Sequence, residues 1–529
     1  MENTYPSTDE PPKSPSTESV FGNSLLSFFV YLKQTLQPFI PCVFGLAFTR
    51  SGVILTNYAG YEQTDGGLLT DSSMMTSLIL LMALFFFIMF KKQYLSKSFV
   101  NRLMRVCVLT QASCTILIAV FSLLNIDNFF LLFSVAVAIS FCTSISIAYW
   151  LRRLRGSDSS LACLYVFTAL IVSETLLYIL TFLPKYTALI TIGIFVLSQL
   201  LCIKQARKNR LAHICSASNP SEGYFGFAKN LVSNKRFLTV TAVGIGLFSF
   251  IIGFLRGAPT GNAIPFTDIT RFGDYIITVL ISILIIYFTL IKKRHSTMTI
   301  GIWIVMQVLV CLAMFCYVAF PNYLEIGAIF TTTSNAMMMV FSWYIILAFT
   351  SYGWRDPYYY AIAGWLVWMG CRALGRLALI AMQPLIMIDG TLHGTDLMFL
   401  MLAITLVICT QVVFTQFFGI MQSDLSTEKK ARSATRLEKI MGLDGASSFS
   451  DVREATMASN AQEIGRQFML SDREIEVLAL YALGHTQKNV AERLFISQGT
   501  AHAHIKRIYS KTGFHSRQDV LDYIVEHLS

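Results

Sequence analysis

The sequence predicts an all-α protein with two parts. The first is a polytopic membrane helical bundle of about twelve helices, arranged six plus six, and the second is a small C-terminal domain of four helices. Composition predicts the bundle: 54% of the 529 residues are apolar and only 14% are charged, against about 25% charged in a soluble domain. The small domain is predicted because the chain turns polar after residue 421 and then contains four short amphipathic segments.

The membrane part is expected at residues 24–421, after a Ser-, Thr- and Pro-rich tail at 1–23 that we expect to be disordered. Stretches of roughly 17 to 25 apolar residues have the length that crosses ~30 Å of hydrocarbon. Twelve such stretches are present, at 36–58, 73–90, 104–124, 129–150, 161–183, 187–203, 237–255, 275–291, 298–320, 326–350, 359–384 and 397–420.

The distribution of Lys and Arg between the loops predicts the orientation of these helices. With the N-terminus inside, the cytoplasmic loops contain 19 of these residues, and the outer loops contain only Lys185, Arg256 and Arg271. We therefore expect a multi-pass protein of the bacterial cell membrane, in contact with lipid, with both termini in the cytoplasm.

The twelve spans divide six and six around the loop at 204–236. In this outline the membrane region resembles the major facilitator superfamily, which implies a central cavity between two halves. One family feature is absent: the loop between the second and third spans reads KKQYLSKSFVNRLMR, without the Gly and Asp of the motif usual in transporters of that family.

Four ionisable residues fall inside the predicted spans, where charges are costly and usually functional. Arg50 lies in the first span, Glu174 in the fifth, and Arg372 and Arg376, four residues apart, in the eleventh. One interpretation is a ligand pocket completed by Trp365, Trp368 and Asn335. The other is a structural ion pair between Glu174 and one of the two eleventh-span arginines. Because two arginines facing one acid leave a spare positive charge, we favour a small anionic ligand.

Residues 422–468 are predicted to be a linker. The part from Glu428 to Met441 is compatible with a short amphipathic helix, and the Gly-Ala-Ser-Ser run at 445–448 is typical of a flexible segment. If flexible throughout, the linker would span roughly 40 Å. That length would let the C-terminal domain at 469–529 leave the membrane surface.

The C-terminal domain shows start and stop signals for four helices. The predicted capping residues are Ser471 with Glu474, Thr486, Ser497, and Ser516 with Asp519, and the predicted stops are Gly484 and Gly513. The third helix has an inward stripe of Ala501, Ile505, Ile508 and Thr512. A tight turn joins the second helix to this basic third helix, which is the helix-turn-helix pattern.

The segment from Leu470 to Ile524 resembles the DNA-binding domain of LuxR-type transcriptional regulators. The matching residues are Leu470, Arg473, Glu474, Val477, Leu478, Gly484, Ala491, Leu494, Ile496, Ser497, Thr500, His504, Ile508, Lys511, Ser516 and Arg517. The sequence departs from the family at Asn489 and Val490, where Glu and Ile are usual, and at Ala501 and His502, where Val and Lys are usual. The resemblance implies double-stranded DNA as partner, bound as a homodimer through this domain.

The third helix is predicted to carry the DNA contacts. By the family pattern, the side chains that face bases are His502, Ala503 and Lys506, and those that bind phosphates are Lys488, Ser497, Thr500, Arg507 and Lys511. A membrane-surface role for the basic tail is disfavoured because it lacks a broad aromatic or Leu face. A metal site at His502 and His504 is disfavoured because residues two apart point to different helix faces.

No constellation of catalytic residues is apparent, so we expect no enzyme activity, no cofactor and no metal. The sequence predicts a membrane-bound one-component transcriptional regulator that binds DNA through its tail and senses a small ligand or a membrane signal through its helices. The alternative is a secondary transporter, similar to the major facilitator superfamily, with an appended DNA-binding tail.

Overall fold

The computed structural model of the chain describes residues 36–58, 68–91, 95–154, 159–208, 235–257, 264, 267–352, 356–387, 400–412 and 449–527, with gaps of one or two residues inside some ranges. These ranges are helical and contain no β-strand. The expectations for the tail at 1–23, for most of the loop at 204–236 and for the linker at 422–448, including its short helix, lie outside the described residues.

Each predicted span corresponds to a helix. The first six are α2 (Ile40–Val53, continued by η1, Ile54–Tyr58), α3 (Leu68–Lys91), α4 (Lys97–Leu124), α5 (Phe129–Leu154), α6 (Ser159–Leu180) and α7 (Lys185–Lys208). The others are α10 (Lys235–Leu255), α11 (Asp268–Ile286, continued by η3, Tyr287–Ile291), α12 (Gly301–Ala319, after η4, His295–Met298), α13 (Leu324–Tyr352), α14 (Pro357–Met387) and a helix at Leu400–Val412.

Nine helices of the described residues are long and apolar enough to cross a membrane. The apolar helices at Ile40–Thr56, Thr239–Leu255 and Leu400–Val412 are shorter. The structure thus supports a multi-span membrane protein, and the count of twelve stays a prediction.

The helix α11 illustrates how the bundle is adapted to lipid. Its buried positions include Thr270, Asp274, Thr278 and Ser282, which recur every four residues and so share one face. Large apolar side chains on the other faces are exposed, among them Leu280, Ile283 and Leu284. Such an apolar exterior is unfavourable in water and is stabilised in hydrocarbon.

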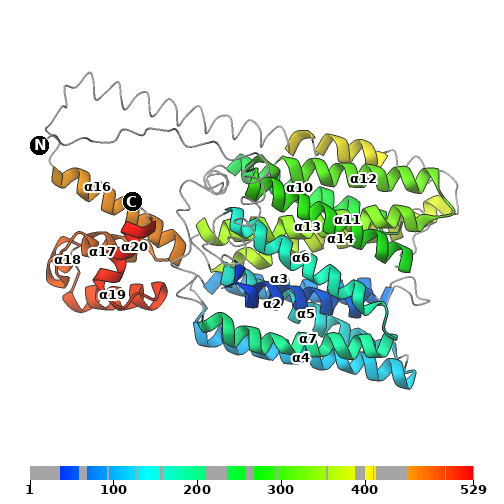
Figure 1. Cartoon of the computed structure of the whole chain (residues 1–529), viewed down its shortest axis with the longest axis horizontal. Coiled ribbons are helices and arrows are strands. Elements are labelled where there is room, and N and C mark those ends of the chain that lie inside the picture. The colour runs from blue at the N-terminus through cyan, green and yellow to red at the C-terminus, as the bar shows by residue number, and fades with distance from the viewer. Residues whose placement is uncertain are drawn as a thin grey trace, which may run out of the picture.

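The helices form two halves side by side (Figure 1). α4 and α7 lie together on one flank, and α12 lies on the opposite flank. Within the second half, α10 and α14 cross closely through two glycines. A Cβ on Gly253 would lie 2.0 Å from the Arg372 carbonyl oxygen, and one on Gly375 would lie 2.0 Å from that of Phe250. Only glycine permits this approach of two helix backbones.

The described part of the C-terminal domain, residues 449–527, contains five helices: α16 (Phe449–Phe468), α17 (Asp472–Ala482), α18 (Gln487–Arg493), α19 (Gln498–Thr512) and α20 (Arg517–His527). α17 to α20 occupy the four predicted places. α16 was not predicted, and the expectation of a linker is wrong for residues 449–468. Its side chains Ala461, Ile464 and Phe468 belong to the domain core. The Phe468 ring packs against those of Phe514 and Tyr523, with centroids 5.6 and 5.7 Å away.

Candidate nucleic-acid interface and membrane cavity

The helix-turn-helix consists of α18, α19 and the turn between them. Thr486 Oγ1 accepts a hydrogen bond from Asn489 N–H (3.3 Å), and Ser497 Oγ accepts one from Thr500 N–H (3.0 Å). These predicted caps are confirmed, and they start the helices because they satisfy backbone donors that the first turn leaves unpaired. Gly513 ends α19 with a φ of 86°, also as predicted.

One face of α19 is buried and the opposite face is open to solvent. The buried side chains are those of the predicted stripe, Ala501, Ile505, Ile508 and Thr512. His502, Lys506 and Arg507 are exposed, while Ala503 and His504 are half-buried. Because α19 contains no acidic residue, its open face carries only basic and neutral side chains. This is the electrostatic character that a polyanion requires.

Three expected phosphate-binding residues lie at helix N-termini. Lys488 is exposed in the first turn of α18, and Ser497 and Thr500 are exposed at the start of α19. The hydroxyl oxygens of Ser497 and Thr500 are 2.7 Å apart. Unpaired backbone N–H groups and the helix dipole favour an anion at this end.

Lys511 differs from the other expected DNA contacts because its ammonium group is engaged inside the domain. Its Nζ donates hydrogen bonds to the Met469 carbonyl oxygen (3.1 Å) and to the Glu474 carboxylate. Glu474 is only 3% exposed, and it also accepts from Ser471 N–H (2.8 Å) in the predicted capping box. Lys511 therefore compensates a buried charge and joins the end of α19 to the start of α17.

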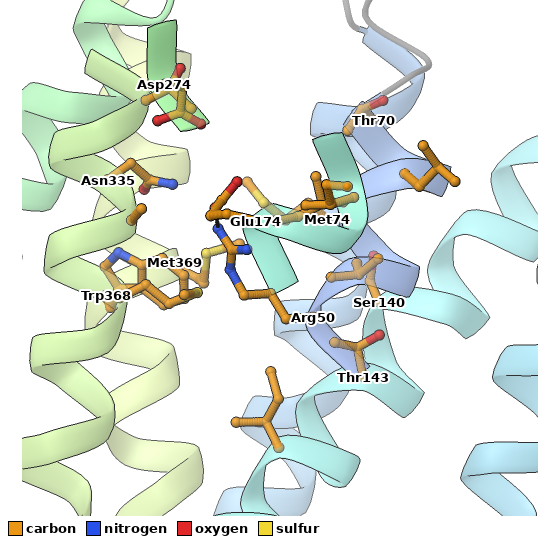
Figure 2. Close-up of a pocket in the computed structure, with 18 of the residues that line it drawn as sticks. Arg50, Thr70, Met74, Ser140, Thr143, Glu174, Asp274, Asn335, Trp368 and Met369 are labelled. Carbon is orange, nitrogen blue, oxygen red and sulfur yellow. Dashed lines mark hydrogen bonds and ion pairs between the residues drawn. The ribbon is translucent and has the colours of Figure 1, made fainter. Parts of the chain in front are cut away.

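The membrane bundle contains a cavity between its two halves (Figure 2). Its walls come from α2, α3, α5 and α6 on one side and α11, α13 and α14 on the other. The space free of protein atoms, open mouth included, is about 1310 Å³. The lining reaches from the middle of the helices to the ends that carry Thr70, Thr181, Arg256 and Arg271. No described lining residue lies at the opposite helix ends, so the cavity extends toward one face only.

Two of the four predicted membrane-site residues line this cavity and form an ion pair. Arg50 Nη2, on α2, bonds Glu174 Oε1, on α6, and Arg50 Nη1 donates to Ser173 Oγ at 2.8 Å. Arg50 is 5% exposed and Glu174 is 6% exposed. Figure 2 shows the pair at the centre of the cavity, opposite the wall that carries Asn335 and Trp368. Pairing is what makes two ionised groups tolerable at this depth.

The other two predicted residues, Arg372 and Arg376, are buried but do not line the cavity. Arg376 Nε on α14 pairs with Asp71 Oδ2 on α3 at 2.9 Å. An ion pair between the two halves therefore exists, but its acid is Asp71, and the expected pairing of Glu174 with Arg372 or Arg376 is wrong. Arg376 and Arg50 each have an acidic partner, so the picture of two arginines facing Glu174 does not hold, and the anionic ligand stays a prediction.

Trp365, Trp368 and Asn335 line the cavity as expected. Buried polar atoms there lack a hydrogen-bond partner among the described residues: Arg50 Nε, Asn335 Oδ1 and Trp368 Nε1. Buried polar groups are normally paired, so these three atoms are available to hydrogen-bond a molecule in the cavity. Asp274, which the sequence reasoning missed, also lines the cavity.

At the end opposite the cavity mouth the two halves are in contact. Asp356, directly before α14, accepts hydrogen bonds from Leu95 N–H (2.9 Å) and from Tyr358 N–H (2.8 Å). The rings of Phe85 on α3 and Tyr359 on α14 stack with centroids 4.9 Å apart. The first turn of α14 therefore closes the bundle on this side.

The C-terminal geometry defines a helix-turn-helix DNA-binding domain, and known proteins show its type. Residues 469–524 match the family described as bacterial regulatory proteins, luxR family. Fimbriae Z protein of Salmonella typhimurium is 43% identical over 58 residues, which are 11% of this chain and 28% of that protein. Oxygen regulatory protein NreC of Staphylococcus aureus is 40% identical over 58 residues, 11% of this chain and 27% of that protein. The chain thus spans about a quarter of the length of these relatives, and the similarity concerns the C-terminal domain.

Proposed function

We propose that the protein is a membrane-bound one-component transcriptional regulator and not an enzyme. The observation that carries the proposal is the open, acid-free face of α19, held on a capped helix-turn-helix in the same chain as a multi-span helical bundle. The LuxR-type match to residues 469–524 supports transcription as its output. In this proposal His502, Ala503 and Lys506 face bases, and Lys488, Ser497, Thr500 and Arg507 bind phosphates.

The domain binds double-stranded DNA as a homodimer from the cytoplasmic side of a bacterial membrane. The excess of Lys and Arg in alternate loops supports cytoplasmic termini. In this orientation the cavity mouth, marked by Thr70 and Thr181, lies on the outer side. A ligand that enters from outside would then contact helices whose cytoplasmic ends lie on the same side of the membrane as the DNA-binding domain.

The membrane part senses a small ligand in the cavity that Arg50 and Glu174 line. Support comes from the polar atoms there that lack partners. The contacts of Asp356 and Tyr359 join the two halves at the closed end, next to the cytoplasm. A bound ligand would act by strengthening or weakening these contacts.

A secondary transporter with a DNA-binding tail is the second candidate. It is favoured by the cavity between two six-helix halves, an arrangement similar to that of the major facilitator superfamily. The two candidates differ in what remains when the tail is removed. A transporter lacking residues 449–529 would still move its substrate, whereas a regulator would lose its output.

The test compares transcripts of cells that express the full chain, a chain that ends at residue 448, and a full chain with Lys506→Ala and Arg507→Ala. Immunodetection in membrane fractions controls for insertion. The proposal expects the truncation and the double substitution to change the same set of transcripts, because both remove DNA binding. Unchanged transcripts in both variants, despite normal amounts in the membrane, would refute the regulator.

A further inference from the structure

Asp274 is a buried carboxylate of the cavity wall that has no ion-pair partner among the described residues. It is 4% exposed. Its Oδ1 accepts hydrogen bonds from the hydroxyls of Thr278 (3.0 Å) and Thr333 (2.9 Å). These two hydroxyls pair with one oxygen of the Asp274 carboxylate, but they do not neutralise its negative charge. Burying an unpaired carboxylate is costly, and a cationic group placed beside Asp274 would offset that cost.

The cations nearest in the cavity do not supply that charge. Arg50 is committed to Glu174 and to the Ser173 hydroxyl. Arg256 and Arg271 lie at the outer end of the cavity and make interactions of their own. Neither forms an ion pair with Asp274. A cationic group that reaches this carboxylate must therefore come from a bound molecule.

The cavity that Asp274 lines also offers aromatic surfaces. Near the mouth, the rings of Tyr178 and Tyr275 stack with centroids 4.6 Å apart and planes 2° apart. Deeper, Trp365 and Trp368 meet edge to face at 5.0 Å and 84°. All four side chains line the cavity. Aromatic faces attract cations through the ring quadrupole, and Trp does so most strongly.

We infer that the cavity binds an organic cation, with its positive group against Asp274 and its apolar or aromatic body along the tyrosine and tryptophan pairs. Asn335 Oδ1 and Trp368 Nε1, which lack partners, are available to polar groups on that body. Figure 2 shows Asp274, Asn335 and Trp368 on one wall, facing Glu174. This inference deepens the proposed sensing role, and it requires only binding to the membrane part.

The experiment uses the purified full chain in detergent and two probes of matched shape and opposite charge, benzyltrimethylammonium and phenylmethanesulfonate. The midpoint of thermal unfolding is measured as each probe is raised through the millimolar range, since a ligand that binds only the folded state raises it by mass action. The ammonium ion is expected to raise the midpoint saturably, and the sulfonate is expected to leave it unchanged. No effect of the ammonium ion, or a larger effect of the sulfonate, would overturn the inference.

Variants locate the site. Asp274→Asn is expected to weaken ammonium binding at least tenfold, while Asp268→Asn, an exposed acid in the first turn of the same helix, is the matched control and should bind normally. Tyr275→Leu leaves every charge in place and should weaken ammonium binding several-fold. This variant tests the site if Asp274→Asn does not fold. Unchanged affinity in a folded Asp274→Asn protein would contradict the assignment. Because no DNA is present, a failure here is distinct from a failure of the regulator proposal.

Discussion

Replacing Lys511 by Met tests whether this lysine stabilises the fold of the DNA-binding domain. The substitution keeps an apolar stem of similar length but removes the ammonium group that bonds Glu474 and the Met469 carbonyl oxygen. Glu474, 3% exposed, would keep only the hydrogen bond from Ser471 N–H. Breaking a buried charge pair costs about 3–5 kcal/mol. Because the Lys511 side chain is 27% exposed, we expect a smaller loss of about 2 kcal/mol, close to the range for hydrogen bonds to charged groups.

The measurement is urea and thermal unfolding of residues 449–529, followed by circular dichroism. This segment has a hydrophobic core of its own, so it is expected to fold alone. For a domain of this size, about 2 kcal/mol corresponds to a fall in Tm of roughly 8–16 °C. The control is Lys506→Met on the open face of the same helix, which is expected to change the free energy of unfolding by less than about 0.5 kcal/mol.

Equal stability of the Lys511→Met and Lys506→Met proteins would refute the structural role of Lys511. The expectation that Lys511 binds DNA phosphate would then stand. A double variant sharpens the test. Glu474→Gln removes the charge that Lys511 compensates, so Lys511→Met should cost clearly less in that background. If the two changes simply add, the pair contributes nothing as a pair.

Two further predictions concern the helix crossing and the DNA-facing surface. Gly375→Ala should destabilise the detergent-purified protein by about 1–3 kcal/mol through overpacking against α10. The control is Gly370→Ala on the same helix, which should not destabilise it, because a Cβ added there meets nothing within 4 Å. Equal thermal midpoints of the two variants would contradict the close crossing. Lys506→Ala should cost about 1–3 kcal/mol on a specific site and relax base preference. Arg507→Ala should weaken all sequences alike and reduce the slope of log K against log salt by roughly 0.9. Parallel losses on specific and random DNA in both variants would show that the two sides of α19 were assigned wrongly.

Features encoded locally could be predicted from the sequence. The caps at Ser471, Thr486 and Ser497 depend on residues three apart, and the buried stripe of α19 depends on helical periodicity, so both were read correctly. The apolar helices could be predicted because their length and hydropathy are properties of single segments. α16 was missed because its core residues Ala461 and Phe468 lie within a stretch that is polar overall.

Long-range pairing could not be predicted in this way. Asp71 and Asp274 lie two residues and one residue before the predicted starts of their spans, so they were not counted as charges at membrane depth. Without Asp71 the sequence pattern gives Arg376 no acid besides Glu174 and therefore favours an anionic ligand. Which acid meets which arginine depends on the packing of α3 against α14 and of α2 against α6, and no pattern within one segment reports this.

The central claim is that a chain embedded in the membrane binds specific DNA through α19. The most direct test is to crosslink the full chain to DNA in its native cell and to sequence the DNA recovered with it. We expect enrichment of a small number of discrete sites that share a motif. This enrichment should be lost in a chain with Lys506→Ala and Arg507→Ala that is present at the same level in the membrane. Recovery of the same DNA with both chains, or of no enriched site with either, would contradict it.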